Sequence, residues 1–210
     1  MTENEIREPV QKRSIEKKEK IINAGFDLIC QKGYYNTNTA EIAKSAGVST
    51  GIIYQYFKDK HDIHNHLISH KSSQLFQNAV KDYQKLPKSI ISFEERMIFF
   101  VDNIVNQLTE NPRLLSFIAK NLSWGFFKNA LTTPVKETDV DFRDVYREML
   151  KEAPEKYAQP ELMLFMIVEL VSSTCYSSIL YSEPVEINKL KPYLYASIRG
   201  IIHTCEKKES

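Results

Sequence analysis

The stretch "SAGVSTGIIYQYFKDK", residues 45–60, decides the fold of the first part of the chain. It holds two of the chain's six glycines, Gly47 and Gly51, and an aromatic group of Tyr54, Tyr56 and Phe57 follows directly. A single packed helix needs neither feature, whereas a sharp turn or a close approach of two backbones favours glycine. The pattern predicts a turn at Gly47 and close approach to a partner at Gly51.

The residues on both sides of this turn carry the signals of two short helices. Asn38 can cap the first helix, with Glu41 at the capping-box position, and Ser49 can cap the second. A turn of three or four residues makes two helices cross steeply, so residues 39–57 are expected to form a helix-turn-helix. The alternative is an ordinary corner between two helices of a bundle.

The outward side of the second helix is polar and nearly free of acids. Hydroxyl, amide and ammonium groups of this kind suit phosphate oxygens and base edges. The side chains concerned are those of Thr50, Tyr54, Gln55 and Tyr56, followed by Lys58 and Lys60, with Gly51 among them. The first acid that follows is Asp59.

The region before this motif predicts one amphipathic helix. Apolar residues recur from Ile15 onward, and Gly33 is a natural stop for the helix. Residues 1–12 are expected to be a frayed polar arm. The segment "QKRSIEKKEK", residues 11–20, holds five basic residues against two acids, so Lys12, Arg13 and Lys17 can add contacts to a nucleic-acid backbone; an ordinary solvated helix start explains it equally well.

The sequence after residue 60 predicts helices throughout, so the fold is expected to be all-α with about nine helices. Capping pairs, prolines and apolar periodicity set their limits. We expect helices at about 61–85, 92–109, 111–127, 139–151, from 160 to just before Pro184, and 186–206, with a loop at 131–138.

Composition limits the class of protein. Hydrophobic residues make up 42% and charged residues 26% of the 210 residues, and the formal charge is +1, as in ordinary soluble proteins. Three scattered cysteines without metal-ligand spacing, and the absence of a signal peptide, favour a cytoplasmic location, with neither metal nor cofactor. The apolar run at 162–181 is interpreted as a buried helix, because Glu169 near its middle would be costly in lipid.

Residues 21–63 resemble the TetR family of bacterial transcriptional regulators. The resemblance covers about the first third of the chain and implies a three-helix DNA-binding domain at 1–60, followed by a larger helical ligand-binding and dimerisation domain at 61–210. The matching residues are Ile21, Ile22, Ala24, Leu28, Ile29, Gly33, Tyr34, Thr39, Ile42, Ala43, Ala46, Gly47, Val48, Ser49, Gly51, Tyr54, Tyr56, Phe57 and Lys60.

The resemblance implies a role for each residue of the motif. Thr39 is expected to bind a phosphate through its hydroxyl, and Gln55 to read a base edge, since an amide suits adenine. Many relatives carry Lys or Arg where this chain has Thr50. The full set of expected DNA-binding residues is Thr39, Ser49, Thr50, Gly51, Tyr54, Gln55, Tyr56, Lys58 and Lys60.

Two further sites are expected in the second part of the chain. The resemblance implies a small, mostly apolar effector that releases a palindromic operator, with Phe117, Trp124, Phe127 and Tyr176 as expected pocket residues. A last helix with an apolar stripe usually needs a partner helix. We expect Leu190, Leu194, Ile198 and Ile201 to lie in a homodimer interface; the alternative is that they belong to the core of a monomer.

Three rival functions were weighed against a DNA-binding repressor. Four histidines at 61–70 suggest a metal-responsive regulator, since His66 and His70 share a helical face, but no cysteine completes a metal site. An enzyme is disfavoured because no phosphate loop, nucleophile elbow or zinc-protease motif occurs. A helical protein-interaction module remains the last alternative, and the polar face beyond Gly47 argues against it. No membrane partner is expected.

Overall fold

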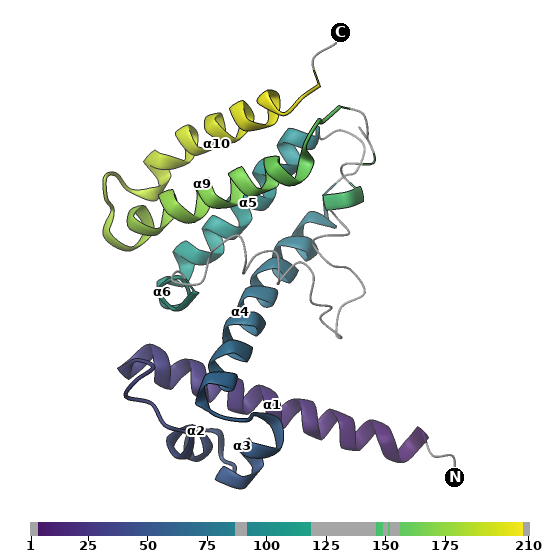
Figure 1. Ribbon diagram of the computed structural model, residues 1–210, viewed down its shortest axis with the longest axis vertical. Coiled ribbons are helices and arrows are strands. Elements are labelled where there is room, and N and C mark those ends of the chain that lie inside the picture. The colour runs from purple at the N-terminus through teal and green to yellow at the C-terminus, as the bar shows by residue number, and fades with distance from the viewer. Residues whose placement is uncertain (1–3, 87–91, 119–145, 149–150, 152–155, 208–210) are drawn as a thin grey trace. The chain divides into compact units, whose positions relative to one another are not determined.

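The computed structural model describes residues 4–86, 92–118, 146–148, 151 and 156–207 (Figure 1). Within these ranges the regular structure is helical apart from one isolated β-bridge, so the all-α prediction is confirmed. The helices are α1 (Asn4–Lys32), α2 (Thr39–Ala46), α3 (Thr50–Tyr56), α4 (Lys60–Tyr83), α5 (Phe93–Glu110), α6 (Pro112–Ile118), α9 (Pro160–Tyr181) and α10 (Ile187–Thr204). Residues 146–148 and 151 are also helical.

Most predicted helices lie within a few residues of their expected bounds, and α1 is the exception. It begins at Asn4, so the prediction of a frayed arm is wrong for residues 4–12, while residues 1–3 lie outside the described residues. Glu, Arg, Gln and Lys, which have high helix propensity, make up most of this segment, and Ile6 and Val10 are four positions apart, a helical spacing. The predicted helical residues 119–127 and 139–145 and the loop at 131–138 lie outside the described residues.

The turn chemistry around α2 follows its local sequence. The Asn38 side chain accepts a hydrogen bond from the Glu41 N–H, and the Asn38 N–H donates to Glu41 Oε2, which completes the predicted capping box. Gly47 ends α2 with φ of 67°, a left-handed conformation that favours glycine. Ser49 occupies the N-cap position of α3, but its side chain makes no capping hydrogen bond, contrary to the prediction.

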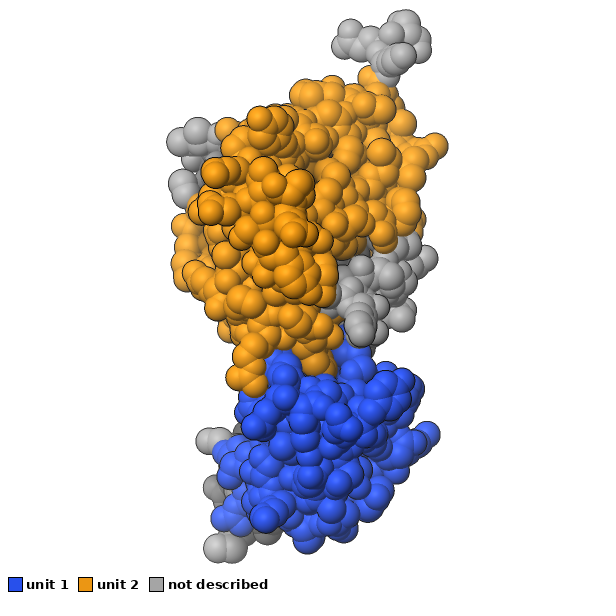
Figure 2. Space-filling view, turned by 90° about the vertical axis from the view of Figure 1, so that its left-hand side faces the viewer, with its two compact units in different colours: residues 1–70 blue, residues 71–210 orange. Residues whose placement is uncertain are grey.

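The chain divides into two compact units, residues 1–70 and 71–210, which Figure 2 shows in blue and orange. The predicted border lay after residue 60, at the start of α4. Residues 61–70 of α4 belong to the first unit because Ile63 and Leu67, both fully buried, pack beside Gly25 of α1. α1 packs against α2, and α2 against α3.

The second unit has its core between α5, α9 and α10. Met97 and Phe100 of α5, Met163 and Ile167 of α9, and Ile198 of α10 are among its buried side chains. A polar group joins α5 to α10 at the edge of this core. Its members are Asp102, Asn106, Lys191 and Tyr195.

Helix α9 is, among the described residues, the one helix long and apolar enough to cross a membrane by length and composition. Its apolar window has a mean hydropathy of 1.6, and 28% of that window is buried inside the structure. α9 packs against α10 and α5, and Met163, Leu164 and Ile167 face the core. Its inward side is therefore that of a core helix, as the sequence predicted, while part of its outer side is exposed.

Candidate nucleic-acid interface

Helices α2 and α3 form the predicted helix-turn-helix. The turn is closed by two backbone hydrogen bonds, from Gly47 N–H to Lys44 O at 3.2 Å and from Val48 N–H to Ala43 O at 3.0 Å. Ile53 is fully buried in the angle between the helices. The side of α3 that carries Thr50, Gly51 and Gln55 is exposed.

The exposed side of α3 carries the predicted DNA-binding residues. Tyr54 is 55% exposed, and its hydroxyl lies 3.3 Å from the Thr39 hydroxyl at the start of α2. Two of the predicted DNA-binding residues thus meet at one point, although 15 positions separate them. The exposed members of the set are Ser49, Thr50, Gly51, Tyr54, Gln55 and Lys58.

Gly51 lies in the first turn of α3, and the fold itself does not demand a glycine there. A Cβ atom built at this position would meet only Ser49 Oγ, at 3.9 Å. Nor does the residue adopt a left-handed φ, which Gly33 and Gly47 do. The absence of a side chain at Gly51 thus keeps the exposed backbone approachable from outside.

Tyr56 is held in place from the N-terminal part of α1. Its hydroxyl hydrogen-bonds with the Ser14 hydroxyl at 3.0 Å, and the Lys18 ammonium lies 6.0 Å from the ring centre of the neighbouring Phe57. The sequence reasoning missed Ser14. Its spacing from Lys18, Ile21 and the rest of the inner face of α1 was the available signal.

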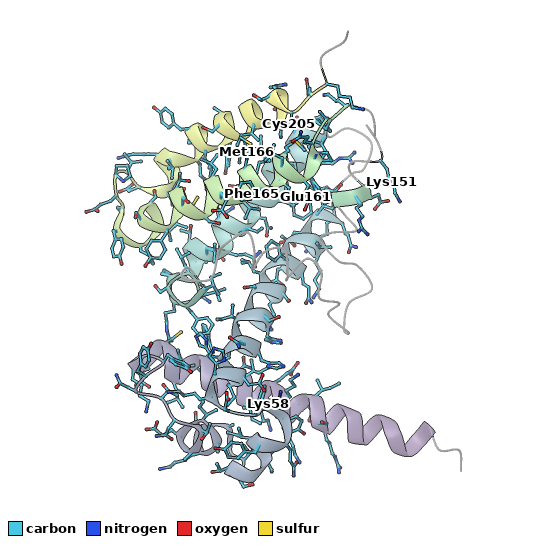
Figure 3. All side chains as sticks on the ribbon, viewed as in Figure 1. Lys58, Lys151, Glu161, Phe165, Met166 and Cys205 are labelled. Atoms are coloured by element: carbon cyan, nitrogen blue, oxygen red, sulfur yellow. The ribbon has the colours of Figure 1, made fainter. Side chains whose placement is uncertain are left out.

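Two lysines follow α3, and the structure gives them different surroundings. Lys58, labelled in Figure 3, is exposed, while its backbone N–H donates to Asp62 Oδ2 at 2.9 Å. The Lys60 ammonium donates to the Tyr34 carbonyl at 3.0 Å and lies 4.3 Å from the Tyr34 ring centre. Lys60 therefore joins the α1–α2 loop to the start of α4, and it retains further N–H donors because an ammonium has three.

Two acids near this surface, Glu41 and Asp62, have protein partners. A hydrogen bond from Lys32, at 2.5 Å, lowers the pKa of Glu41, and the Asn38 N–H adds to the effect. The backbone N–H of Lys58 likewise lowers the pKa of Asp62. Both carboxylates are engaged by donors of the protein itself, which reduces their repulsion of an approaching phosphate.

Two histidines of α4 contact side chains of the protein. His66 Nδ1 lies 3.2 Å from Asp62 Oδ1, and the His64 ring lies 4.8 Å from the Tyr34 ring. Burial lowers the pKa of His64, and nearby His61 lowers it further. Across the described part of the chain, no group of three His, Cys, Asp or Glu side chains is placed to hold a metal ion.

Two of the four expected effector-pocket residues, Phe117 and Tyr176, lie within the described residues. Trp124 and Phe127 lie outside the described residues. Phe117 is buried on α6, whereas Tyr176 is half-buried on α9 with its ring 6.1 Å from that of Tyr181. The pocket therefore stays a prediction.

The apolar stripe of α10 faces the core of its own chain. Leu194 is 3% exposed and Ile198 fully buried, while Leu190 and Ile201 are half-buried against the same core. The expectation that Leu194 and Ile198 form a dimer surface is therefore corrected, because α5 and α9 already cover them. An apolar stripe shows that a helix has a partner, but not whether that partner is in the same chain.

The exposed apolar residues of the last two helices lie elsewhere. On α9 they are Leu162, Phe165 and Met166, which are 36–45% exposed, and Tyr181, which is 61% exposed at the end of the helix; on α10 Tyr193 is 74% exposed. Figure 3 labels Phe165 and Met166 on α9. Leu162 and Met166 are four residues apart, so they share one helical face.

Comparison with known proteins shows that the segment containing the helix-turn-helix matches a known family. Residues 21–67 match the family described as "Bacterial regulatory proteins, tetR family". HTH-type transcriptional regulator HbdR of Aromatoleum sp. (strain CIB) is 52% identical over 48 residues, which cover 23% of this chain and 21% of that protein. Probable HTH-type transcriptional regulator YttP of Bacillus subtilis (strain 168) is 25% identical over 187 residues, 85% and 86% of the two chains. The strong identity is thus confined to a short segment, about a fifth of HbdR.

Solved structures share the fold over most of the chain. The transcriptional regulator FadR from Bacillus subtilis, solved in complex with stearoyl-CoA, superimposes with a TM-score of 0.62 at 19% identity. The superposition covers 86% of this chain and 96% of that one. At this identity the likeness concerns the fold alone, an N-terminal helix-turn-helix followed by a larger helical part.

Proposed function

The chain belongs to the tetR family of bacterial regulatory proteins, and from this membership we propose that it is a repressor that binds a palindromic operator as a homodimer. Members of this family are DNA-binding transcriptional regulators. The proposal includes a cytoplasmic location, release by a small effector, and no catalytic activity.

The observation that carries the proposal is the combination of an open glycine and a polar face on α3. Gly51 is exposed although neither packing nor backbone conformation requires glycine there. Around it lie Thr50, Tyr54 and Gln55, all exposed. Donors on such a helix can bind phosphates for position and base edges for sequence. In this proposal Gln55 reads a base, and Thr39, Tyr54, Tyr56, Lys58 and Lys60 contact the backbone, with Ser49 at the start of the helix.

A homodimer is proposed because one helix-turn-helix reads only half of a palindrome. The exposed apolar side chains on α9 support association through the last two helices, in place of the buried Leu194 and Ile198. We propose Phe165 and Met166 as the centre of the contact between two copies. A symmetric dimer would bring the same residues of both copies together.

The effector is proposed to be small and mostly apolar. The second unit is rich in aromatic side chains, among them the group formed by Tyr83, Phe99 and Phe100. FadR from Bacillus subtilis, which shares the fold, was solved with stearoyl-CoA, a ligand with a long acyl chain. Such a ligand releases DNA if it binds more tightly to the conformation that does not fit the operator.

The test is selection of the purified protein against a random duplex library at two salt concentrations. A palindromic motif whose affinity falls steeply with salt is expected, because each neutralised phosphate releases counterions. Equally weak binding to every sequence would overturn the operator proposal. A helical protein-interaction module would then become the better description.

A further inference from the structure

The Lys60 ammonium is held by Tyr34 in two ways. It donates a hydrogen bond to the Tyr34 carbonyl at 3.0 Å, and it lies 4.3 Å from the centre of the Tyr34 ring, which is within the range of a cation–π interaction. Tyr34 comes shortly after the end of α1, and Lys60 is the first residue of α4. The direction of the Lys60 side chain is therefore set by a residue outside its own helix.

Tyr34 is itself anchored on two sides. The ring of His64, which lies one helical turn after Lys60 on the same face of α4, has its centre 4.8 Å from the centre of the Tyr34 ring. The Tyr34 carbonyl also accepts a hydrogen bond from the N–H of Thr37, a residue that is 1% exposed. Because ring and backbone are each held, Tyr34 is a fixed support for the ammonium.

The contact orders Lys60 without neutralising its charge. A carbonyl and a ring face carry no net charge, in contrast to the Glu41 carboxylate that holds Lys32. Within the part of the chain that the structure describes, Lys60 forms no ion pair with an acid. An ammonium has three N–H donors, and the carbonyl takes one of them. Lys60 therefore keeps its full charge and further donors for an external anion.

A lysine that is ordered before its partner arrives binds that partner more tightly. Lysine has a long flexible stem, and immobilising such a side chain on binding lowers affinity by about twofold to tenfold. Since Tyr34 already fixes the Lys60 ammonium in the protein alone, DNA does not have to order it. The effect on affinity then depends on the Tyr34 ring although the ring itself need not touch DNA.

We propose that Tyr34 is a positioning residue for operator binding, which acts by holding the Lys60 ammonium ready for a backbone phosphate. The inference rests on the proposed function, in which Lys60 contacts the DNA backbone, and it adds a residue of the loop between α1 and α2 to that surface. Phosphate contacts carry no sequence information, so Tyr34 contributes to affinity and not to base choice.

A double-mutant cycle in the full-length protein tests this. Fluorescence anisotropy on the selected operator gives Kd for wild type, Y34L, K60Q and Y34L/K60Q. Y34L removes the ring, and Kd should rise about fivefold or more, because both protomers of a dimer lose an ordered lysine. In the K60Q background the same change should alter Kd by less than about twofold, since no ammonium is left to position.

Salt dependence shows whether Lys60 is the phosphate contact. K60Q should lower the magnitude of the salt slope by about 1.8, because a dimer loses two contacts of about 0.9 each. Y34F keeps the ring face and should bind as wild type does. Y35L removes the neighbouring ring, which is 91% exposed, and is the matched control with wild-type affinity.

Circular dichroism establishes that each variant is folded. If Y34L does not fold, pentafluorophenylalanine at position 34 takes its place in the cycle, because it keeps the shape of Phe without the negative ring face that attracts a cation. It should then weaken binding in the wild-type background and leave K60Q unaffected.

An equal loss of affinity at position 34 with and without the Lys60 ammonium would overturn the inference, because Tyr34 would then support the fold alone. Wild-type affinity in a folded Y34L, or a wild-type Kd and salt slope in K60Q, would overturn it as well. All these results would leave the operator proposal standing. Failure of the wild type to select any operator would instead count against the proposed function.

Discussion

The hydroxyl groups of Thr39 and Tyr54 lie 3.3 Å apart, on different helices of the helix-turn-helix. Tyr54 is 55% exposed, so the pair lies at the surface. Two hydroxyls in contact can share one acceptor, since each has an O–H to donate. A phosphate oxygen placed against the pair would join α2 and α3 to the same point of the DNA backbone.

Replacing Tyr54 by Phe removes this hydroxyl and little else. Loss of one hydrogen bond is worth about 0.5–1.5 kcal/mol, so Kd for the operator should rise roughly threefold to tenfold in Y54F. Fluorescence anisotropy on the selected operator measures the change, and circular dichroism checks the fold. Tyr35, which is 91% exposed and outside the proposed surface, supplies the matched control Y35F. Equal affinities of Y54F and Y35F would contradict the phosphate role of the pair.

The two glycines of the motif should respond differently to alanine. Gly47 has φ of 67°, a conformation that costs a residue with Cβ about 1–2 kcal/mol, so G47A should lower the free energy of unfolding by that amount. Gly51 has room for a Cβ and lies in a helix, where alanine is preferred. G51A should leave stability equal or slightly raised, as measured by urea unfolding.

Operator binding, unlike stability, should be weakened by alanine at Gly51. In G51A an added methyl group stands between the helix backbone and DNA, and we expect Kd to rise about tenfold or more although the protein is fully folded. The measurement is anisotropy on the same operator. An unchanged Kd in G51A would mean that the backbone at Gly51 does not approach DNA closely.

The sequence was most informative where structure depends on neighbouring residues. Asn38 with Glu41, and Gly47, were predicted as cap and turn, and the structure has both because they satisfy backbone hydrogen bonds within a few residues. The contact between Ser14 and Tyr56 spans 42 positions, and although helical spacing places Ser14 on the inner face of α1, no local pattern identifies Tyr56 as its partner. The start of α1 was predicted as an arm because residues 4–12 are mainly polar, with Ile6 and Val10 as the apolar pair at helical spacing.

The role of Leu194 and Ile198 shows a second limit. Their helical spacing correctly indicated a covered face, but periodicity is the same whether the cover is α9 of the same chain or a second copy. Burial in the folded chain decides between these possibilities. The predicted pocket stays a prediction, since Trp124 and Phe127 lie outside the described residues.

The polar group between α5 and α10 predicts a dependence of stability on pH. Burial raises the pKa of Asp102, but hydrogen bonds from Lys191, at 2.7 Å, and from Tyr195 outweigh it, so that the pKa is lowered overall. A carboxyl whose pKa is lowered by folding contributes stability above its unfolded pKa, about 3.9, and loses it as pH falls through the folded value. The contribution is therefore complete at neutral pH.

The D102N variant tests this by urea unfolding at several pH values. At pH 7 it should be less stable than wild type by about 1–3 kcal/mol, since hydrogen bonds to a charged group are lost. The difference should narrow as pH falls below about 4. Asp27, an exposed carboxylate on α1, supplies the control D27N, whose stability should follow that of wild type throughout. A D102N difference that stays constant with pH would rule out a role for the charge.

The proposed dimer contact can be separated from the core of the protomer by two substitutions. Met166 is 37% exposed on α9, so M166E should fold normally but place a charge in the contact between two copies, where an unpaired carboxylate is costly. Sedimentation velocity should show a monomer, with weaker operator binding as a consequence. Leu194 is 3% exposed within one chain, so L194A should instead lower the free energy of unfolding by about 2–5 kcal/mol and remain dimeric. If M166E stays dimeric while L194A is folded and monomeric, the α9 surface is rejected as the dimer contact. The apolar stripe of α10 would then be the interface.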